Sequence, residues 1–276
     1  LCEEGEEEYD EEALKKSNTV VEVIDSEEEL TPERLAAMDI LHQPERVIIE
    51  YNGMWLVSNF EKTQLPTGWG VEQQITCVDG STFQMYMANM KSIFMDMIKN
   101  TDMVIFNRCK KEDPLPTYRR GIKVANQRAE VIFEDEEGEL GDIFQDEMPF
   151  DMNAPVIEIL PEDYGIWFVD AMDHPENYEG KTVKFKARVM KPRGMGSKFF
   201  VPGRTAMTCC ADDTTFLGYV CKSAYAPKLT PGEWVEVTAK VGIEKRNEYQ
   251  GEEGIVLAAE HVEQCDPLED EMVYFN

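Results

Sequence analysis

Met103-Val104-Ile105-Phe106-Asn107 is a short apolar run that ends in an amide side chain, and it is one of several short apolar runs in the N-terminal half of the chain. Four further apolar runs are separated by helix-length segments, and they cover residues 20–24, 46–50, 74–78 and 130–133. Strands that alternate with helices at this spacing are typical of a parallel sheet with helices on both faces. We therefore predict an α/β nucleotide-binding domain over residues 1–150.

Helix signals separate the predicted strands. Thr31 and Pro32 are suited to the N-cap and first position of a helix over 31–41. Ser81 is expected to cap a longer helix whose apolar stripe runs from Phe83 to Ile98. A third helix is predicted over 114–127. The many methionines of the second helix are interpreted as core residues.

Polar residues follow three of the predicted strands, where an α/β sheet binds its ligand. Glu50 precedes Gly53, and we interpret them as a carboxylate that orients Mg²⁺-bound water and an amide that senses the γ-phosphate. Asp79 follows the next strand, and Asn107 can hydrogen-bond a purine edge. Each motif alone also fits an ordinary turn. Their occurrence at successive strand ends favours a nucleotide site.

The phosphate loop G-x-x-x-x-G-K-[ST] is absent from these residues, which begin at Leu1, and we expect it upstream. Gly180-Lys181-Thr182 does not replace it, because Pro175 stands five residues before Gly180.

Residues 1–135 resemble the CobW-type P-loop GTPases, a family of metal chaperones and insertases, without their first strand and phosphate loop. The resemblance rests on five motifs in order: Cys2-Glu3-Glu4-Gly5-Glu6 with Asp10, Glu50 with Gly53, Val78-Asp79, Asn107-Arg108-Cys109-Lys110, and Asn126 with Ala129. It implies a catalytic role for Glu50 and Gly53. It further implies nucleotide binding by Asp79, Asn107 and Arg108.

The same resemblance implies GTP, Mg²⁺ and zinc as ligands, with Glu3, Glu6 and Glu50 near the metal. Two features depart from the family. Its Cys-x-Cys-Cys motif is missing between Tyr9 and Glu50, and Lys110 stands where an Asp normally recognises guanine. Glu112 or Asp113 could substitute, or the protein could accept ATP.

The C-terminal part follows a different pattern. Residues 182–189 alternate strictly, so Val183, Phe185, Ala187 and Val189 should face a core. Further strands are predicted over 198–210, 215–222, 232–243 and 254–262, after a short helix near 161–172. We predict a small OB-like β-barrel over residues 151–276.

This second part resembles the YcgQ-like domain through Tyr178 to Lys181, residues 203–213 and residues 232–235. That family is similar to proteins encoded beside permeases and CobW-type GTPases, which implies a permease complex as a partner. Cys209, Cys210, Cys221 and Asp212 are candidate metal ligands that would replace the missing thiol motif. The alternative is that the adjacent cysteines are core residues.

Charge and cysteine content limit the function further. The net charge of −28 argues against a general nucleic-acid binder. The basic stripe Lys184, Lys186 and Arg188 is interpreted as a solvated face, since no outward aromatic accompanies it. Seven cysteines without regular spacing indicate reduced thiols and a cytoplasmic protein, and no run is long enough to span a membrane.

Together these observations predict a GTP-binding protein whose intact form is a GTPase that delivers zinc to a client protein. Without a phosphate loop the present residues are expected to be inactive in hydrolysis. The alternative is a non-enzymatic protein that binds a metal or a partner through its C-terminal barrel.

Overall fold

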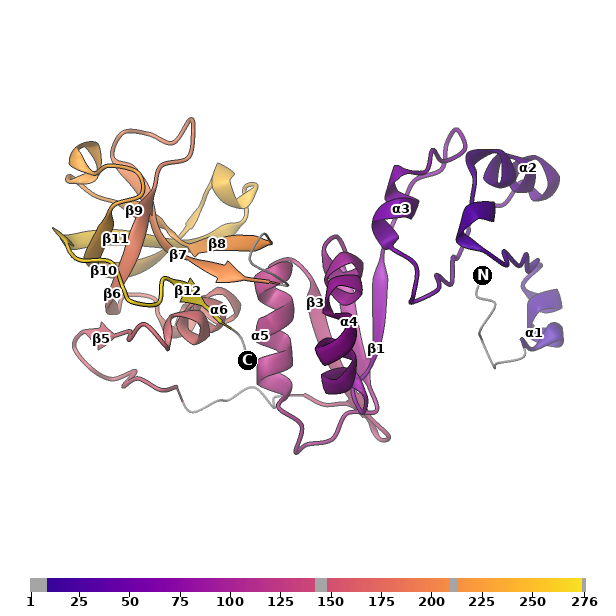
Figure 1. Ribbon diagram of the computed structural model, residues 1–276, viewed down its shortest axis with the longest axis horizontal. Coiled ribbons are helices and arrows are strands. Elements are labelled where there is room, and N and C mark those ends of the chain that lie inside the picture. The colour runs from indigo at the N-terminus through magenta and orange to yellow at the C-terminus, as the bar shows by residue number, and fades with distance from the viewer. Residues whose placement is uncertain (1–8, 142–147, 209–212, 275–276) are drawn as a thin grey trace.

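The structure is a computed structural model that describes residues 9–141, 148–208 and 213–274. Figure 1 shows three parts in a row: a β-barrel, a small sheet covered by α4 and α5, and an N-terminal segment that carries α1 to α3. The hydrophobic residues form a separate core in each part. The barrel contacts the sheet on the side of α5, and the N-terminal segment adjoins β1.

A three-stranded parallel sheet lies at the centre of the chain. It consists of β1 (Ile75–Asp79), β2 (Met103–Asn107) and β3 (Glu130–Asp135), and β4 (Gly138–Glu139) pairs antiparallel with β3. The helices α4 (Phe83–Ile98) and α5 (Leu115–Ala125) connect the parallel strands. A parallel sheet is thus present, as the alternation of strand and helix patterns predicts.

The two helices cover the same face of this sheet, which corrects the expectation of helices on both faces. Phe83 of α4 and Tyr118 of α5 have ring centroids 4.7 Å apart, and both contact Phe106 of β2. On the opposite face Ile75 and Cys77 are exposed, and Ile105 is only partly buried. Parallel sheets are normally buried on both sides. The described residues therefore leave one apolar sheet face open.

Residues 20–24 and 46–50 form no strand, contrary to the prediction. Within the described residues β1 pairs only with β2, so these segments have no ladder to join. Ile24 is buried in the core of the N-terminal segment, but most of the other apolar side chains are exposed, and Ile48 is 84% exposed. An extended segment gains strand structure only from a partner strand, because its backbone groups must be paired.

Short helices make up the rest of the N-terminal segment: α1 (Glu11–Lys16), η1 (Glu27–Glu29), α2 (Pro32–His42) and α3 (Val57–Lys62). The predicted cap of α2 is confirmed, because the Thr31 hydroxyl accepts a hydrogen bond from the Arg34 amide at 3.2 Å. The predicted cap of α4 is wrong. Thr82 occupies that position, because the Ser81 hydroxyl instead donates to Asp79.

The C-terminal part is a closed five-stranded barrel. Its strands are β6 (Thr182–Met190), β7 (Phe199–Met207), the third strand formed by β8 (Thr214–Gly218) and β9 (Val220–Lys222), β10 (Trp234–Lys245) and β11 (Glu253–Gln264). β6 pairs with both β7 and β10, and β9 runs parallel to β11, which closes the barrel. This arrangement confirms the predicted OB-like barrel and its strands.

Shorter elements complete this part: β5 (Ile157–Glu158), α6 (Tyr164–Asp173), η2 (Pro175–Asn177), η3 (Ala226–Lys228), η4 (Asn247–Tyr249) and β12 (Met272–Val273). The core-facing residues predicted from the alternation are all buried, including Val183 and Phe185. Trp167 of α6 packs on Phe185 with ring centroids 4.8 Å apart. The helix therefore closes part of the barrel core.

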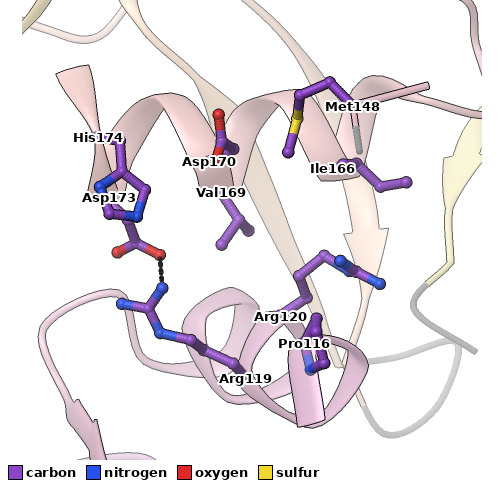
Figure 2. A pocket seen from close by; sticks show the side chains of 9 residues that line it. All are labelled: Pro116, Arg119, Arg120, Met148, Ile166, Val169, Asp170, Asp173 and His174. Atoms are coloured by element: carbon purple, nitrogen blue, oxygen red, sulfur yellow. Dashed lines mark ion pairs between the residues drawn. The ribbon is translucent and has the colours of Figure 1, made fainter. Parts of the chain in front are cut away.

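Two helices join the sheet to the barrel, and Figure 2 shows the small cavity between them. Arg119 and Arg120 extend from α5, while Asp173 and His174 lie at the end of α6. The Arg119 guanidinium is 2.7 Å from the Asp173 carboxylate, and Lys123 of α5 is 3.5 Å from the second carboxylate oxygen. Charged contacts thus connect the two parts. Among the described residues no helix is both long and apolar enough to span a membrane.

Candidate functional site

The carboxyl ends of β1 and β2 bring together the three residues predicted to bind nucleotide. Asp79 and Asn107 are register partners on adjacent strands. The Arg108 guanidinium lies 2.6 Å from the Asp79 carboxylate, and the Gly80 amide donates to the Asn107 carbonyl at 2.8 Å. Because parallel strands end at one edge of a sheet, these side chains face a shared surface.

Asp79 is held in its ionised form at this edge. Its carboxylate accepts hydrogen bonds from the Ser81 amide at 2.9 Å and from the Ser81 hydroxyl at 2.6 Å. The Ser81 hydroxyl chiefly, with Arg108 in support, lowers the pKa of Asp79 below its ordinary value. A carboxylate with a lowered pKa stays an acceptor at neutral pH.

The turn after each strand is closely packed. A Cβ atom on Gly80 would lie 2.7 Å from the Cys109 sulfur and 3.0 Å from the Asn107 carbonyl oxygen, so only glycine fits. Arg108 adopts a left-handed backbone conformation with φ of 54°. That conformation is uncommon for a residue other than glycine and is frequent at functional sites.

The side-chain oxygen of Asn107 is buried and has no hydrogen-bond partner among the described residues. Asn126 provides a contrast, because its amide donates to Ile98 and Thr101 and its oxygen accepts from Ala129. Asn126 therefore has a structural role, because both its amide nitrogen and its side-chain oxygen form hydrogen bonds with the backbone. A buried oxygen without a partner is costly, and a ligand that donates to it would recover that cost.

The acids proposed to compensate for Lys110, Glu112 and Asp113, lie in the same loop as Lys110, between β2 and α5. The Asp113 carboxylate accepts a hydrogen bond from the Lys110 amide at 2.7 Å, so it stabilises the loop backbone. Glu112 is exposed and makes no hydrogen bond within the described part of the chain. Asp79 is the carboxylate that lies next to Asn107 in register.

Glu50 and Gly53 lie in a different environment. The segment before Glu50 is not a strand, and the Glu50 carboxylate accepts a hydrogen bond from the Tyr9 hydroxyl at 2.7 Å. The Gly53 carbonyl accepts from Tyr86 of α4 at 3.4 Å. Within the described ranges no hydrogen bond or ion pair connects either residue with Asp79 or Asn107. The two proposed catalytic residues are thus not connected to the residues predicted to bind the base.

Most of the proposed metal ligands fall outside the described residues, namely Glu3, Glu6, Cys209, Cys210 and Asp212. Cys221 lies in the barrel core, and burial raises the pKa of its thiol to about 12. Because zinc binds the thiolate, this position disfavours Cys221 as a ligand. In the described part of the chain no three His, Cys, Asp or Glu side chains form a group able to hold a metal ion. Zinc binding therefore has no support from the described side chains.

Sequence reasoning missed the contribution of Ser81 and Cys109 to the edge. The signal was present in Asp79-Gly80-Ser81, because an Asp side chain commonly accepts from the amide two residues on. The contact of Cys109 with Gly80 gives no such signal, since it depends on the close approach of two adjacent turns.

One family model matches the C-terminal part of the chain. The fold there is an OB-like barrel, and residues 139–275 match the model of the family described as the DUF1980 C-terminal domain. This match agrees with the YcgQ-like resemblance of the C-terminal part. No curated protein matches the chain.

Solved structures give only weak likenesses. A mitochondrial single-stranded DNA binding protein from S. cerevisiae, Rim1, is 10% identical, with 32% of this chain and 97% of that chain covered and a TM-score of 0.20. Aspartyl tRNA synthetase from Entamoeba histolytica is 15% identical, with 43% of this chain and 27% of that chain covered and a TM-score of 0.23. TM-scores this low support no inference about function.

Proposed function

We propose that this chain is a GTP-binding protein of the CobW type, whose intact form hydrolyses GTP to drive zinc delivery to a client protein. The observation that carries the proposal is the edge formed by Asp79, Asn107 and Arg108, with the Asn107 side-chain oxygen buried and without a partner. The CobW-type resemblance of residues 1–135 assigns these same positions to nucleotide binding.

In this proposal the nucleotide base lies against the carboxyl ends of β1 and β2. The Asn107 amide contacts the purine edge. Arg108, whose side chain is 69% exposed, covers the face of the base with its planar guanidinium. Asp79 keeps Arg108 oriented, because the two groups are already in contact.

The phosphates need further residues. The phosphate loop would supply backbone N–H groups and a Lys, and Mg²⁺ would neutralise the developing charge. We propose that residues 1–150 form this nucleotide domain together with that loop, and residues 151–276 the barrel. The exposed edge of β1 and the unpaired segments 20–24 and 46–50 are consistent with a sheet that takes further strands.

The proposal is tested by equilibrium titration of the full-length natural protein with GTP and Mg²⁺, followed by competition with ATP. We expect GTP binding with a modest preference over ATP, because the Lys110 ammonium is a donor and accepts nothing from guanine N1–H and N2–H. A preference beyond about a thousandfold would show that another acid recognises guanine. The absence of any GTP binding would remove the proposed function.

A second candidate is a non-enzymatic protein that binds a metal or a partner, such as a permease complex, through the barrel. The observation that favours it is the family match over residues 139–275, which covers the barrel and none of the three parallel strands. Zinc titration of the full chain tests whether the barrel binds a metal. This candidate predicts one site that Cys210→Ser weakens more than Cys265→Ser, and no zinc binding at all would contradict it.

A further inference from the structure

A groove of about 710 Å³ opens between two loops of the barrel. One wall is the loop between β6 and β7, and the other is the loop between β10 and β11. Ligand sites in proteins commonly have volumes of roughly 300–1,000 Å³. In OB-type barrels the loops after the first and fourth strands flank the ligand.

The first wall is positively charged. Residues 191–198 contain Lys191, Arg193 and Lys198 and no acidic residue, in a chain whose net charge is −28. Lys191 is engaged, because its ammonium donates to the Leu229 carbonyl at 2.5 Å. Arg193 is exposed and makes no ion pair with any other described residue. Its guanidinium is therefore available to an anion.

The second wall is held in place by Arg246. Its guanidinium lies over the Phe199 ring at 4.4 Å from the centroid and contacts both Glu248 carboxylate oxygens, at 2.9 and 3.1 Å. Glu248 thereby balances the charge of Arg246. The neighbouring Lys245 is exposed and has no ion-pair partner within the described ranges. The two available cations, Arg193 and Lys245, thus line the groove from opposite loops.

Hydrogen bonds and packing within each loop hold the walls of the groove in place. On the first loop the Phe199 amide donates to the Gly196 carbonyl at 2.9 Å, and Gly196 packs against the Phe199 ring. On the second loop the Tyr249 hydroxyl donates to the Ile255 carbonyl at 2.5 Å. A site whose walls are already fixed loses less entropy when it binds.

The basic stripe on the barrel wall is a weaker candidate for the same ligand. Lys184 lies 3.0 Å from Glu236, and Arg188 lies 3.6 Å from Glu271. These contacts offset the charge of the stripe, as expected for a solvated face. The groove differs because two of its cations, Arg193 and Lys245, form no ion pair with any described residue, and because the apolar side chains of Met195 and Phe199 also line it.

We propose that this groove binds a nucleotide unit, with Arg193 and Lys245 on its phosphate, and with Met195 and the Arg246 guanidinium that covers Phe199 against its base. A free nucleotide and the end of a single strand present the same phosphate and base, so the chemistry of recognition is shared. Arginine and lysine are the side chains that bind phosphate, and aromatic and apolar surfaces accept bases of any sequence. The net charge disfavours long nucleic acids, whereas the local charge of the groove favours one or a few units.

The test uses the full chain and two probes that lack guanine: uridine 5′-monophosphate followed by calorimetry, and a short fluorescent oligouridylate followed by anisotropy. Arg193→Glu and Lys245→Glu should each weaken binding by about tenfold or more. Lys240→Glu, an equal charge change on an exposed barrel residue outside the groove, should leave it within about twofold. Circular dichroism confirms that each variant is folded.

The two probes identify the source of the unit. Equal affinity for both probes assigns the groove to a free nucleotide. Tighter binding of the oligouridylate assigns the groove to a single strand. In that case the slope of the logarithm of the binding constant against the logarithm of the salt concentration should fall in magnitude by roughly 0.7 for each phosphate contact removed. The proposal is overturned if neither probe binds, if Lys240→Glu weakens binding as much as Arg193→Glu, or if a polyglutamate peptide competes as well as uridine 5′-monophosphate.

Discussion

The Arg119 guanidinium lies 2.7 Å from the Asp173 carboxylate, and this pair joins the helix that follows the sheet to the helix that closes the barrel. Lys123 reaches the other oxygen of the same carboxylate at 3.5 Å. The Asp173 side chain is only 7% exposed, and burial lowers the pKa of Lys123. One carboxylate therefore balances two largely buried cations between the two parts of the chain.

We predict that Asp173→Asn destabilises the protein by about 3 kcal/mol, because removal of one partner from a buried ion pair leaves the other charge desolvated. Chemical denaturation of the full chain measures the change. Glu176→Gln is the matched control, since Glu176 is an exposed acid near His174 and should alter stability by less than about 0.5 kcal/mol. Equal stability of Asp173→Asn and the wild-type chain would show that the contact does not couple the two parts.

Gly80→Ala should destabilise the chain by about 1–3 kcal/mol, because the added Cβ would meet the Cys109 sulfur at 2.7 Å. Gly121→Ala is the control, since Gly121 lies in α5 with open space around it. Alanine there should stabilise the helix by about 0.5–1 kcal/mol. The two glycine variants are compared by thermal unfolding. If Gly80→Ala is as stable as Gly121→Ala, the two turns are less closely packed than described.

The described cysteines should differ in their reactivity with an alkylating reagent. Cys77 is exposed, whereas burial raises the pKa of Cys109 to about 11 and that of Cys221 to about 12. A pKa of about 12 leaves roughly one thiol in ten thousand ionised at pH 8, and the thiolate is the reactive species. Cys77 should therefore react first and Cys221 last.

Mass spectrometry of the labelled peptides measures this order. Labelling of Cys109 should rise about tenfold for each pH unit up to about pH 11, because its thiolate fraction rises in that proportion. Rapid labelling of Cys221 at pH 8 in the folded chain would contradict its position in the barrel core. It would also restore Cys221 as a candidate ligand for zinc.

The sequence predicts the barrel better than the sheet, and the reason is physical. The alternation of residues 182–189 specifies which side chains are buried, and a closed barrel supplies every strand with neighbours. Residues 20–24 and 46–50 have a similar apolar content but no partner strand among the described residues. Apolar runs indicate that a strand is compatible with the sequence, whereas pairing decides whether it forms.

The candidate site, like the sheet, is predicted only in part from the sequence. Asp79 and Asn107 are brought together because they end adjacent parallel strands, which the spacing of the motifs indicates. Glu50 is not joined to them, because its segment is outside the sheet. The contact of Arg119 with Asp173 had no signal, since it links residues far apart in the sequence.

The affinity of Asn107→Ala for GTP tests the central claim most directly. Calorimetry of the full-length natural protein with GTP and Mg²⁺ should show binding that the variant weakens by about 1–3 kcal/mol, or roughly five- to 150-fold, because a buried base contact is lost. Asn126→Ala is unsuitable as a control, since its amide supports the backbone. Asn89→Ala, at an exposed position of α4, should bind GTP as the wild-type protein does. Unchanged affinity in Asn107→Ala would contradict the base-binding role of this edge.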